Sequence, residues 1–504
     1  MVDNSRQRQV GALLSYAYSI VSAVIGLLYV PILLSTMGSS EYGLYQLIGS
    51  IMSYMSLMNS VFSGGITRYY CKYLADGNVQ KMQGILAAGR QLYTIMSFVA
   101  IAVGFGAIVV FSAVYRSVLS EFQLIESGIM LAAISANLIV SMQNSLSVAV
   151  VIANERFIFQ RGLQLVLLVM QPVVVVCLVW VFPYAVLIPL IQLCLNCIAA
   201  LMQWAFARCK LDMKIKKYPD SKDLIRSLLV FSSGMLLALI ADQIFWRTNQ
   251  LILGFFYGMT TVAIYAVASQ IVTSYMALGT AISQVFLPKV IKLIASDSGM
   301  NAVSELFARV GRLTLYPLLL VLTGFLIFGI PFINLWAGSG FEEAYYVALI
   351  LMIVATVDLS QNLGLTILQA VNKYHVRGIV YICLAIGNCA AVALLASNVG
   401  IVGVALCSAI AMLIGNGIVM NCYYSRNIGL QIGYFWTQVF RLSAPLMVFA
   451  LVVNTIISNI SITWSWQLLI GALLVYCVTF FIWAFVFSMN DYEKNLIKRV
   501  TLKK

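Results

Sequence analysis

Apolar residues in this chain gather in long uninterrupted runs instead of alternating with polar ones. A helix needs about 20 successive apolar residues to cross the hydrocarbon core of a bilayer. Fourteen runs reach that length, at about residues 13–36, 42–62, 91–115, 127–152, 160–182, 184–206, 226–257, 260–287, 313–336, 345–370, 377–396, 399–423, 441–458 and 467–488. Strands of a membrane barrel would alternate. The pattern therefore predicts an all-α polytopic membrane protein.

The composition agrees, since 62% of the 504 residues are hydrophobic and only 9% are charged. Arg6 and Arg8 precede the first run, but no small-residue cleavage pattern follows a short apolar core. We expect the first run to be a retained membrane anchor.

The net charge of +13 follows the loops of this topology. When the loops are assigned alternately to the two sides, every Lys and Arg except Arg116 and Arg247 falls on the side of the N-terminus. Basic loops stay cytoplasmic, so both termini are expected inside the cell. The charge is then explained by topology and contact with anionic lipids, and not by nucleic acid.

The inventory of reactive side chains is small, with ten Cys and one His. Cys194 and Cys197 form a CxxC, but it lies in a predicted membrane helix without a nearby His, so packing is the better reading. His375 lies in a short predicted loop. No catalytic triad, phosphate-binding loop or metal-ligand set is evident, which predicts neither an enzyme nor a cofactor or metal.

The two halves of the chain contain an internal repeat. Gln143, Asn144 and Asn154 recur 218 residues later as Gln361, Asn362 and Asn372, and an Arg-Gly pair follows each copy. The offset spans six runs, an even number, so both copies have the same orientation. This predicts six-helix lobes at 1–208 and 226–426, a basic cytoplasmic linker at 209–225, and two extra helices with a basic tail at 427–504.

Polar residues follow one face of the first two helices of each lobe. Because lipid offers no hydrogen-bond partners, such faces must meet protein or water. Tight helix packing is one explanation, since small residues also allow close approach. A central hydrated cavity is the other, and its candidate lining residues are Tyr29, Gln46, Trp246, Asn249, Gln270 and Gln284.

Asp242 and Arg247 are two charges inside the seventh run. Five residues separate them, about 140° around a helix, so they are not expected to neutralise each other. Arg247 could pair with Asp358 of the tenth run, reach outward to the membrane surface, or grip an anionic substrate group with two parallel hydrogen bonds. Asp242 and Asp358 are candidates for binding a coupling proton or cation, or are hydrogen-bonded structural acids.

Four segments carry a resemblance to a known family. They are "GSSEYGLYQLIGS" (38–50), "GGITRYYCKYLADGN" (64–78), "NQLILGFFYGMTTVAIYAVASQI" (249–271) and "IPFINLWAGSGFEEAYYVALILMI" (330–353). Together with the helix count, they resemble the polysaccharide-transporter branch of the MATE-like (MOP) superfamily, which includes Wzx-type flippases. One departure is Asn249, where the family often has an acid.

The resemblance implies a flippase for polyprenyl-pyrophosphate-linked oligosaccharide in the bacterial cytoplasmic membrane. The two lobes would rock to expose a cavity alternately, and a proton or sodium gradient could drive them. Arg68, Arg90 and Arg309 would attract the pyrophosphate at the inner mouth, or are ordinary positive-inside charge. A monomer suffices, with membrane lipid and polysaccharide assembly enzymes as the expected partners.

Two other function classes compete. A cation-coupled multidrug exporter of the same superfamily would favour an acid-rich cavity, and Arg247 speaks against it. A membrane glycosyltransferase or ligase would need clustered carboxylates at one membrane face, whereas Glu41, Glu121, Glu126 and the Glu342-Glu343 pair are scattered along the sequence.

Overall fold

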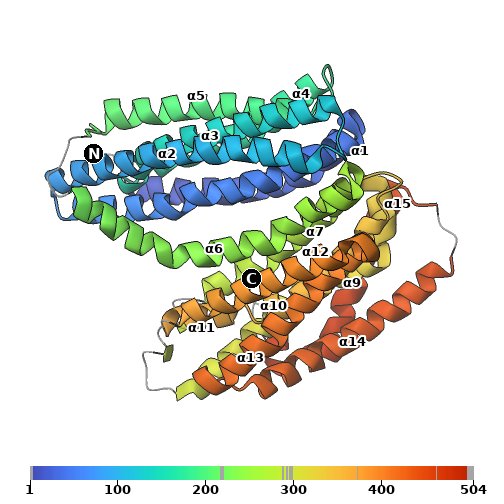
Figure 1. Ribbon diagram of the computed structural model, residues 1–504. Helices are drawn as coiled ribbons and strands as arrows, with labels where there is room; N and C mark the ends of the chain where they lie inside the picture. Colours follow the sequence, from blue (N-terminus) through green and yellow to red (C-terminus); the bar gives the residue numbers. More distant parts are fainter. Residues whose placement is uncertain are drawn as a thin grey trace. The chain divides into compact units, whose positions relative to one another are not determined.

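The computed structural model describes residues 4–215, 221–286, 289–290, 293–294, 299–371, 373–460 and 463–495, and these residues contain helices and no strand (Figure 1). The helices are α1 (Asn4–Ala75), α2 (Val79–Tyr115), α3 (Glu121–Ala153), α4 (Phe157–Val179), α5 (Leu187–Lys210), α6 (Ser221–Tyr257), α7 (Met259–Val285), α9 (Gly299–Trp336), α10 (Glu343–Ser360), α11 (Leu363–Ala370), α12 (Tyr374–Met412), α13 (Met420–Tyr423), α14 (Ile432–Ser458) and α15 (Trp466–Trp483). Short π-helical turns η1 (Leu413–Val419), η2 (Tyr424–Ile428) and η3 (Ala484–Ser488) extend α12, α13 and α15.

The described residues confirm the fourteen membrane-length segments. Eleven continuous helical stretches are long and apolar enough to cross a bilayer. Two of them are bent at glycines with positive φ, Gly38 (φ 79°) and Gly400 (φ 65°), so each contains two segments. Only glycine adopts this conformation without a steric cost. The 37-residue α6 corresponds to the seventh predicted run and completes the set.

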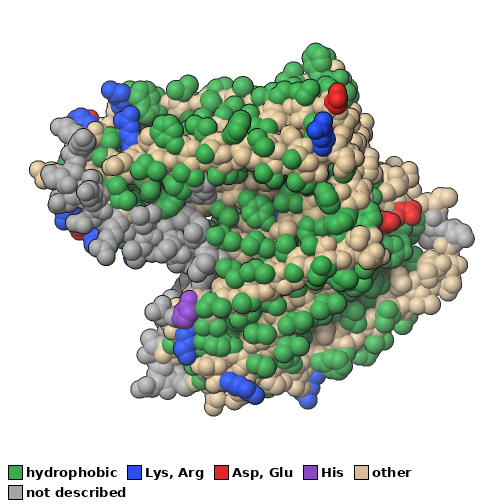
Figure 2. Space-filling view, in the orientation of Figure 1, with side chains coloured by type: hydrophobic (Ala, Val, Ile, Leu, Met, Phe, Trp, Pro, Cys, Tyr) green, Lys and Arg blue, Asp and Glu red, His purple; other side chains and the backbone are tan. Residues whose placement is uncertain are grey.

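The outer surface is that of a protein immersed in lipid. Figure 2 shows a visible face covered largely by hydrophobic side chains, with Lys, Arg, Asp and Glu gathered mostly toward the helix ends. Large apolar residues such as Leu394 (77% exposed) and Phe105 (69% exposed) point outward. In water this exposure would drive aggregation, whereas in a bilayer these side chains meet acyl chains. The chain is an integral membrane protein.

The chain forms two compact units, residues 1–266 and residues 267–504. In unit 1, α3 packs against α1, α2 and α5, and α6 packs against α1 and α2. Gly43 marks the closest approach, because a Cβ there would lie 1.9 Å from the carbonyl oxygen of Met259. The second arm of α1, which is the part after Gly38, therefore contacts the start of α7 backbone to backbone.

Unit 2 is built around α9, which packs against α10, α14 and α15. The division between the units lies inside α7, whereas the repeat predicts lobes that meet at the 209–225 linker. Both repeat segments end a helix, at Ala153 of α3 and Ala370 of α11, and the next helix begins within four residues. Asn372, one of the repeated residues, lies outside the described residues, as do residues 216–220 of the predicted linker. The lobe boundaries remain a prediction.

Several helices extend well beyond their apolar runs. The ninth run begins at residue 313, but α9 begins at Gly299, and the eleventh begins at 377, but α12 begins at Tyr374. Arg312 and Arg377, which the alternation of loops assigns to loops on the side of the N-terminus, therefore lie within helices. Arg312 is 4% exposed inside α9, and the Arg377 side chain is 16% exposed in the first turn of α12. An apolar run ends at the edge of the hydrocarbon core, but backbone hydrogen bonds continue the helix into the polar region.

Candidate substrate and ion sites

The second arm of α1 holds α6 in place at the depth of the two charges in the seventh run. Ser50 donates a hydrogen bond to Gln250, and the hydroxyls of Tyr54 and Thr248 are 2.5 Å apart. Within α6, Arg247 is half-buried and Asp242 is exposed. Arg247 lies near Tyr45 of α1. The hydrogen bonds between α1 and α6 therefore hold the part of α6 that carries Arg247 within unit 1.

The predicted polar lining residues of unit 1 have partners close by. Asn249 is 1% exposed and donates to the hydroxyl of Tyr265 over 2.8 Å. Gln46 donates to Tyr42 on its own helix, also over 2.8 Å. These contacts give both amides a structural role, since a buried amide needs partners. Their role in binding substrate remains a prediction.

The other predicted lining residues are placed as follows. Trp246 is half-buried and packs edge-on against Phe245, with 5.3 Å between ring centroids. The hydroxyl of Tyr29 is buried, with no hydrogen-bond partner among the described residues. Gln270 of α7 is half-buried. The side chain of Gln284 lies outside the described residues.

Asp358 lies near the middle of the tenth predicted run, 345–370. In the structure it lies close to the C-terminal end of α10 instead. Oδ1 of Asp358 is 3.9 Å from a guanidinium nitrogen of Arg377, and the hydroxyl of Tyr381 is 3.5 Å from Oδ2. Arg377 also donates to this hydroxyl, as does Asn416. In unit 2 the acid thus has a basic partner on α12, a contact that the loop assignment of Arg377 concealed.

Arg68, Arg90 and Arg309 are exposed on α1, α2 and α9. Arg90 lines a cavity of about 490 Å³ together with Trp204, Arg208, Asp212, Met213, Lys214 and Ile215. Within it, Lys214 pairs with Asp212 at 2.7 Å, and Arg208 lies over the ring of Trp204. Arg309 forms an ion pair with Glu305, one turn earlier in α9. Arg90 is thus part of a pocket that also holds Arg208 and Lys214.

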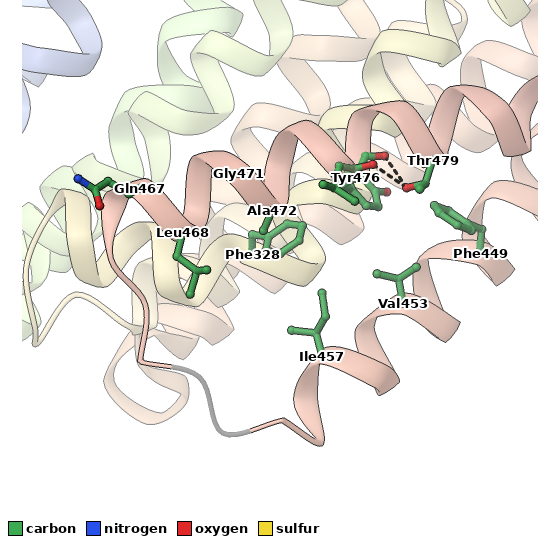
Figure 3. A pocket seen from close by; sticks show the side chains of 11 residues that line it. Phe328, Phe449, Val453, Ile457, Gln467, Leu468, Gly471, Ala472, Tyr476 and Thr479 are labelled. Atoms are coloured by element: carbon green, nitrogen blue, oxygen red, sulfur yellow. Dashed lines mark hydrogen bonds between the residues drawn. The ribbon is translucent and has the colours of Figure 1, made fainter.

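An apolar groove of about 500 Å³ lies along α14 and α15, with α9 at one side (Figure 3). Phe449, Val453 and Ile457 line it from α14, and Leu468, Gly471, Ala472 and Val475 from α15. Tyr476 packs against Phe328 and Phe449 and donates to Thr323 over 2.7 Å. The groove cannot be predicted from the sequence, because its apolar residues are indistinguishable there from those that face lipid.

A buried ion pair attaches the end of the chain to α9. Arg312 makes two hydrogen bonds to the carboxylate of Glu493, at 2.7 and 2.8 Å, and donates further to the carbonyls of Gln438 and Ser488. Tyr316 donates to the same carboxylate over 2.8 Å. Burial alone would raise the pKa of Glu493, but the hydrogen bonds from Arg312 and from the Asn490 amide hold it below its ordinary value.

In the residues that the structure describes, no three His, Cys, Asp or Glu side chains gather as they would around a metal ion. No curated protein matches this sequence.

Solved structures with a similar fold are transporters. The chain superposes on the lipid II flippase MurJ in an inward closed conformation with a TM-score of 0.68 and 14% identity, covering 97% of this chain and 99% of that one. An inward-facing multidrug resistance MATE transporter of the MOP superfamily gives 0.57 at 10% identity, over 82% and 96% of the two chains. The MATE transporter VcmN from Vibrio cholerae, in its bent form, gives 0.52 at 13% identity, over 86% and 100%.

At these identities the similarity establishes the fold alone, which the chain shares with MurJ and with MATE transporters. A family model described as "Polysaccharide biosynthesis protein" matches residues 32–346, more than half of the sequence. The chain belongs to this polysaccharide biosynthesis family, as the four resembling segments indicated.

Proposed function

We propose that this protein is a flippase that moves polyprenyl-pyrophosphate-linked oligosaccharide from the cytoplasmic to the outer leaflet of the bacterial cytoplasmic membrane. The single observation that carries the proposal is Arg247, a half-buried guanidinium within a membrane helix of a polysaccharide biosynthesis family member. A permanent cation at that depth is energetically costly, which makes Arg247 a candidate functional residue. A pyrophosphate is the part of this substrate that a guanidinium binds in a bidentate manner.

The apolar groove along α14 and α15 supports the same proposal. A polyprenyl chain is a long hydrocarbon that can stay in the bilayer while its head group crosses. The groove offers aliphatic walls and the ring of Phe449, and the polar side chains of Gln467 and Thr479 also line it. Holding the tail there would keep the head group near the protein during the crossing. Ordinary acyl chains would occupy the groove when no substrate is bound.

Alternating access would be driven by an ion gradient in this proposal, with Asp242 the acid to test in unit 1, because it is exposed on α6. Asp358 is less suited to releasing a proton or cation, since Arg377 already neutralises it. Both termini would lie in the cytoplasm, a monomer would suffice, and enzymes of polysaccharide assembly would be neighbours in the membrane.

The test is a flipping assay in liposomes that contain a fluorescent polyprenyl-pyrophosphate oligosaccharide in both leaflets. An external glycosidase then measures how much of the inner pool becomes accessible, under imposed proton or sodium gradients. The wild type should expose that pool. Arg247→Ala should slow exposure at least about tenfold, because a hydrogen bond to a charged group contributes about 1.5–3 kcal/mol. Arg247→Lys should be intermediate, since it keeps the charge but loses the planar fork.

The assay has two matched controls, Arg116→Ala for the charge and Ile470→Trp for the groove. Arg116→Ala removes an exposed Arg after α2 and should leave flipping unchanged. Gly471→Trp places a bulky ring in the groove, where a Cβ meets open space, and should slow flipping, whereas Ile470→Trp on the exposed side of α15 should not. If wild type moves the lipid and Arg247→Ala moves it equally fast, the flippase stands and the role of Arg247 is structural.

A cation-coupled multidrug exporter is the second candidate, and the exposed Asp242 together with the MATE-like fold favours it. It predicts that wild-type liposomes move an organic cation against its gradient and leave the lipid-linked glycan in place. Asp242→Asn would then abolish transport while Arg247→Ala would not.

A further inference from the structure

Two glutamates that are far apart in the sequence meet in unit 1. Glu41 lies near the start of the second arm of α1, and Glu126 lies in the second turn of α3. Oε2 of Glu41 accepts a hydrogen bond from the amide of Ala185 over 3.1 Å, and Oε1 of Glu126 accepts one from the amide of Val186 over 2.9 Å. Because the two amides are consecutive, they bring the two carboxyl groups together.

The carboxyl of Glu126 is close enough to that of Glu41 to interact with it, and the Glu41 side chain is half-buried. Glu126 is 3% exposed, and its Oε2 has no hydrogen-bond partner among the described residues. An ionised carboxylate only accepts hydrogen bonds. Two ionised carboxylates that face each other would therefore repel and would leave a buried oxygen unsatisfied, and both effects disfavour the doubly charged pair.

The surroundings provide for one negative charge but not for two. Val186 is the residue before α5, so the carboxyls cap the positive end of that helix, and Val186 itself offers no side-chain cap. A helix N-terminus favours a nearby anion. In the described part of the chain no Lys or Arg forms a salt bridge with either glutamate. A proton placed on one carboxyl turns the repulsive contact into a short, charge-assisted O–H···O bond.

The other titratable side chains at this end of the packed elements do not supply a competing charge. Arg116, after α2, and Glu121, at the first position of α3, are exposed. The phenols of Tyr42, Tyr45, Tyr115 and Tyr184 are neutral near pH 7. Tyr184 packs against Phe122 of α3, with 5.3 Å between centroids, which holds the segment before α5 against α3.

We propose that Glu41 and Glu126 form a proton-binding site that holds one proton between two carboxyls and fastens the start of α5 to α1 and α3. This inference rests on the geometry of unit 1 and not on the proposed transport function. The site takes a proton and leaves a single negative charge for the two amides. Loss of that proton would set two charges against each other and loosen the start of α5.

The test is infrared spectroscopy of the full-length protein in lipid nanodiscs, with glutamate carboxyls labelled with ¹³C so that aspartates do not contribute. At pH 7 the wild type should show the C=O stretch of a protonated glutamic acid, shifted by the label. Glu41→Gln and Glu126→Gln should each lose this band, because one proton serves both groups. Glu121→Gln, a matched change at an exposed position of α3, should keep it.

Three outcomes would overturn the proposal: no protonated-glutamate band in the wild type at pH 7, a band that survives in both variants, or a band that sodium removes at constant pH. The last outcome would identify a metal-cation site instead. Thermal unfolding of the wild type provides a measurement that needs no variant. A proton held more tightly in the folded state contributes stability at low pH that is lost as pH rises, so stability should fall together with the band.

Discussion

In unit 2 the buried carboxylate of Glu493 lies against Arg312, whereas in unit 1 the buried carboxyl of Glu126 lies against another acid, Glu41. Both carboxyls are almost fully enclosed, at 5% and 3% exposed. The Arg312 pair is fully hydrogen-bonded and needs no exchangeable group. The glutamate pair leaves an oxygen without a partner in the described part of the chain. An enclosed acid with a base is thus a fixed structural element, while an enclosed acid with an acid requires a proton.

Asp358 and Arg377 are an intermediate case. The pair is longer, at 3.9 Å, and both side chains keep about a sixth of their surface exposed, at 18% and 16%. The hydroxyl of Tyr381 contacts both residues, because it accepts a hydrogen bond from Arg377 and donates one to Asp358. The charged contacts thus differ in how enclosed they are and in how many hydrogen bonds they make. Mutations test whether these two properties set their contribution to stability.

The largest effect is expected from breaking the buried pair. Arg312→Ala leaves the charge of Glu493 enclosed with Tyr316 and a backbone amide as its remaining partners. Removing one partner of a buried pair costs about 3–5 kcal/mol. Denaturant unfolding of the detergent-solubilised protein should show this loss of unfolding free energy.

The control for that experiment is on the same helix. Arg309 pairs with Glu305 one turn away, and their side chains are 45% and 54% exposed. Arg309→Ala should change the free energy of unfolding by only about 0.2–1 kcal/mol. Equal losses in the two variants would mean that enclosure does not set the strength of these pairs.

A smaller loss is expected at the intermediate pair. Asp358→Asn removes the negative charge beside Arg377 but keeps an oxygen for Tyr381, so the loss should be about 1–3 kcal/mol. A double-mutant cycle with Arg377→Gln measures the coupling directly. A coupling energy near zero would show that the hydrogen bond from Arg377 to the Tyr381 hydroxyl holds the guanidinium without help from Asp358.

The pH dependence of stability should have opposite signs in the two units. Arg312 and the Asn490 amide hold the pKa of Glu493 below its ordinary value, even though burial acts to raise it. A lowered pKa contributes stability above the unfolded value, about 4.3 for Glu, that is lost as pH falls through the folded value. The wild type should therefore lose stability below about pH 4.3, and Glu493→Gln should lack that slope.

Thermal unfolding as a function of pH checks this prediction, with Glu305→Gln as the exposed matched variant on α9. A slope that is the same in Glu493→Gln and in the wild type would contradict it. At the alkaline end, the glutamate pair of unit 1 should produce the opposite slope, which Glu41→Gln should remove.

A small effect is expected for a neutral hydrogen bond at the floor of the groove. Tyr476→Phe deletes the 2.7 Å hydrogen bond to Thr323 without changing the ring that packs against Phe449. Thr323 still donates to the Leu319 carbonyl. The loss should be about 1 kcal/mol. A loss as large as that of Arg312→Ala would contradict the order of the contacts.

The sequence by itself determined the helical class, the fourteen membrane segments and the family. Hydrophobicity alone suffices for the class and the segments, because every backbone group in lipid must be satisfied within its own helix. It also indicated that Asp242, Arg247 and Asp358 are unusual, since a charge inside an apolar run is visible without any structure. It could not supply their partners.

Only the tertiary structure decided which charges meet. Glu493 is 181 residues from Arg312, and Glu41 is brought to Glu126 by amides about 60 residues further along the chain. Nothing in local spacing encodes such contacts, because they depend on which helices pack together and where each helix ends. Arg312 and Arg377 show this most clearly, since their helices begin before the apolar runs do. Whether a charge is solvated, paired or protonated is set by packing between remote segments.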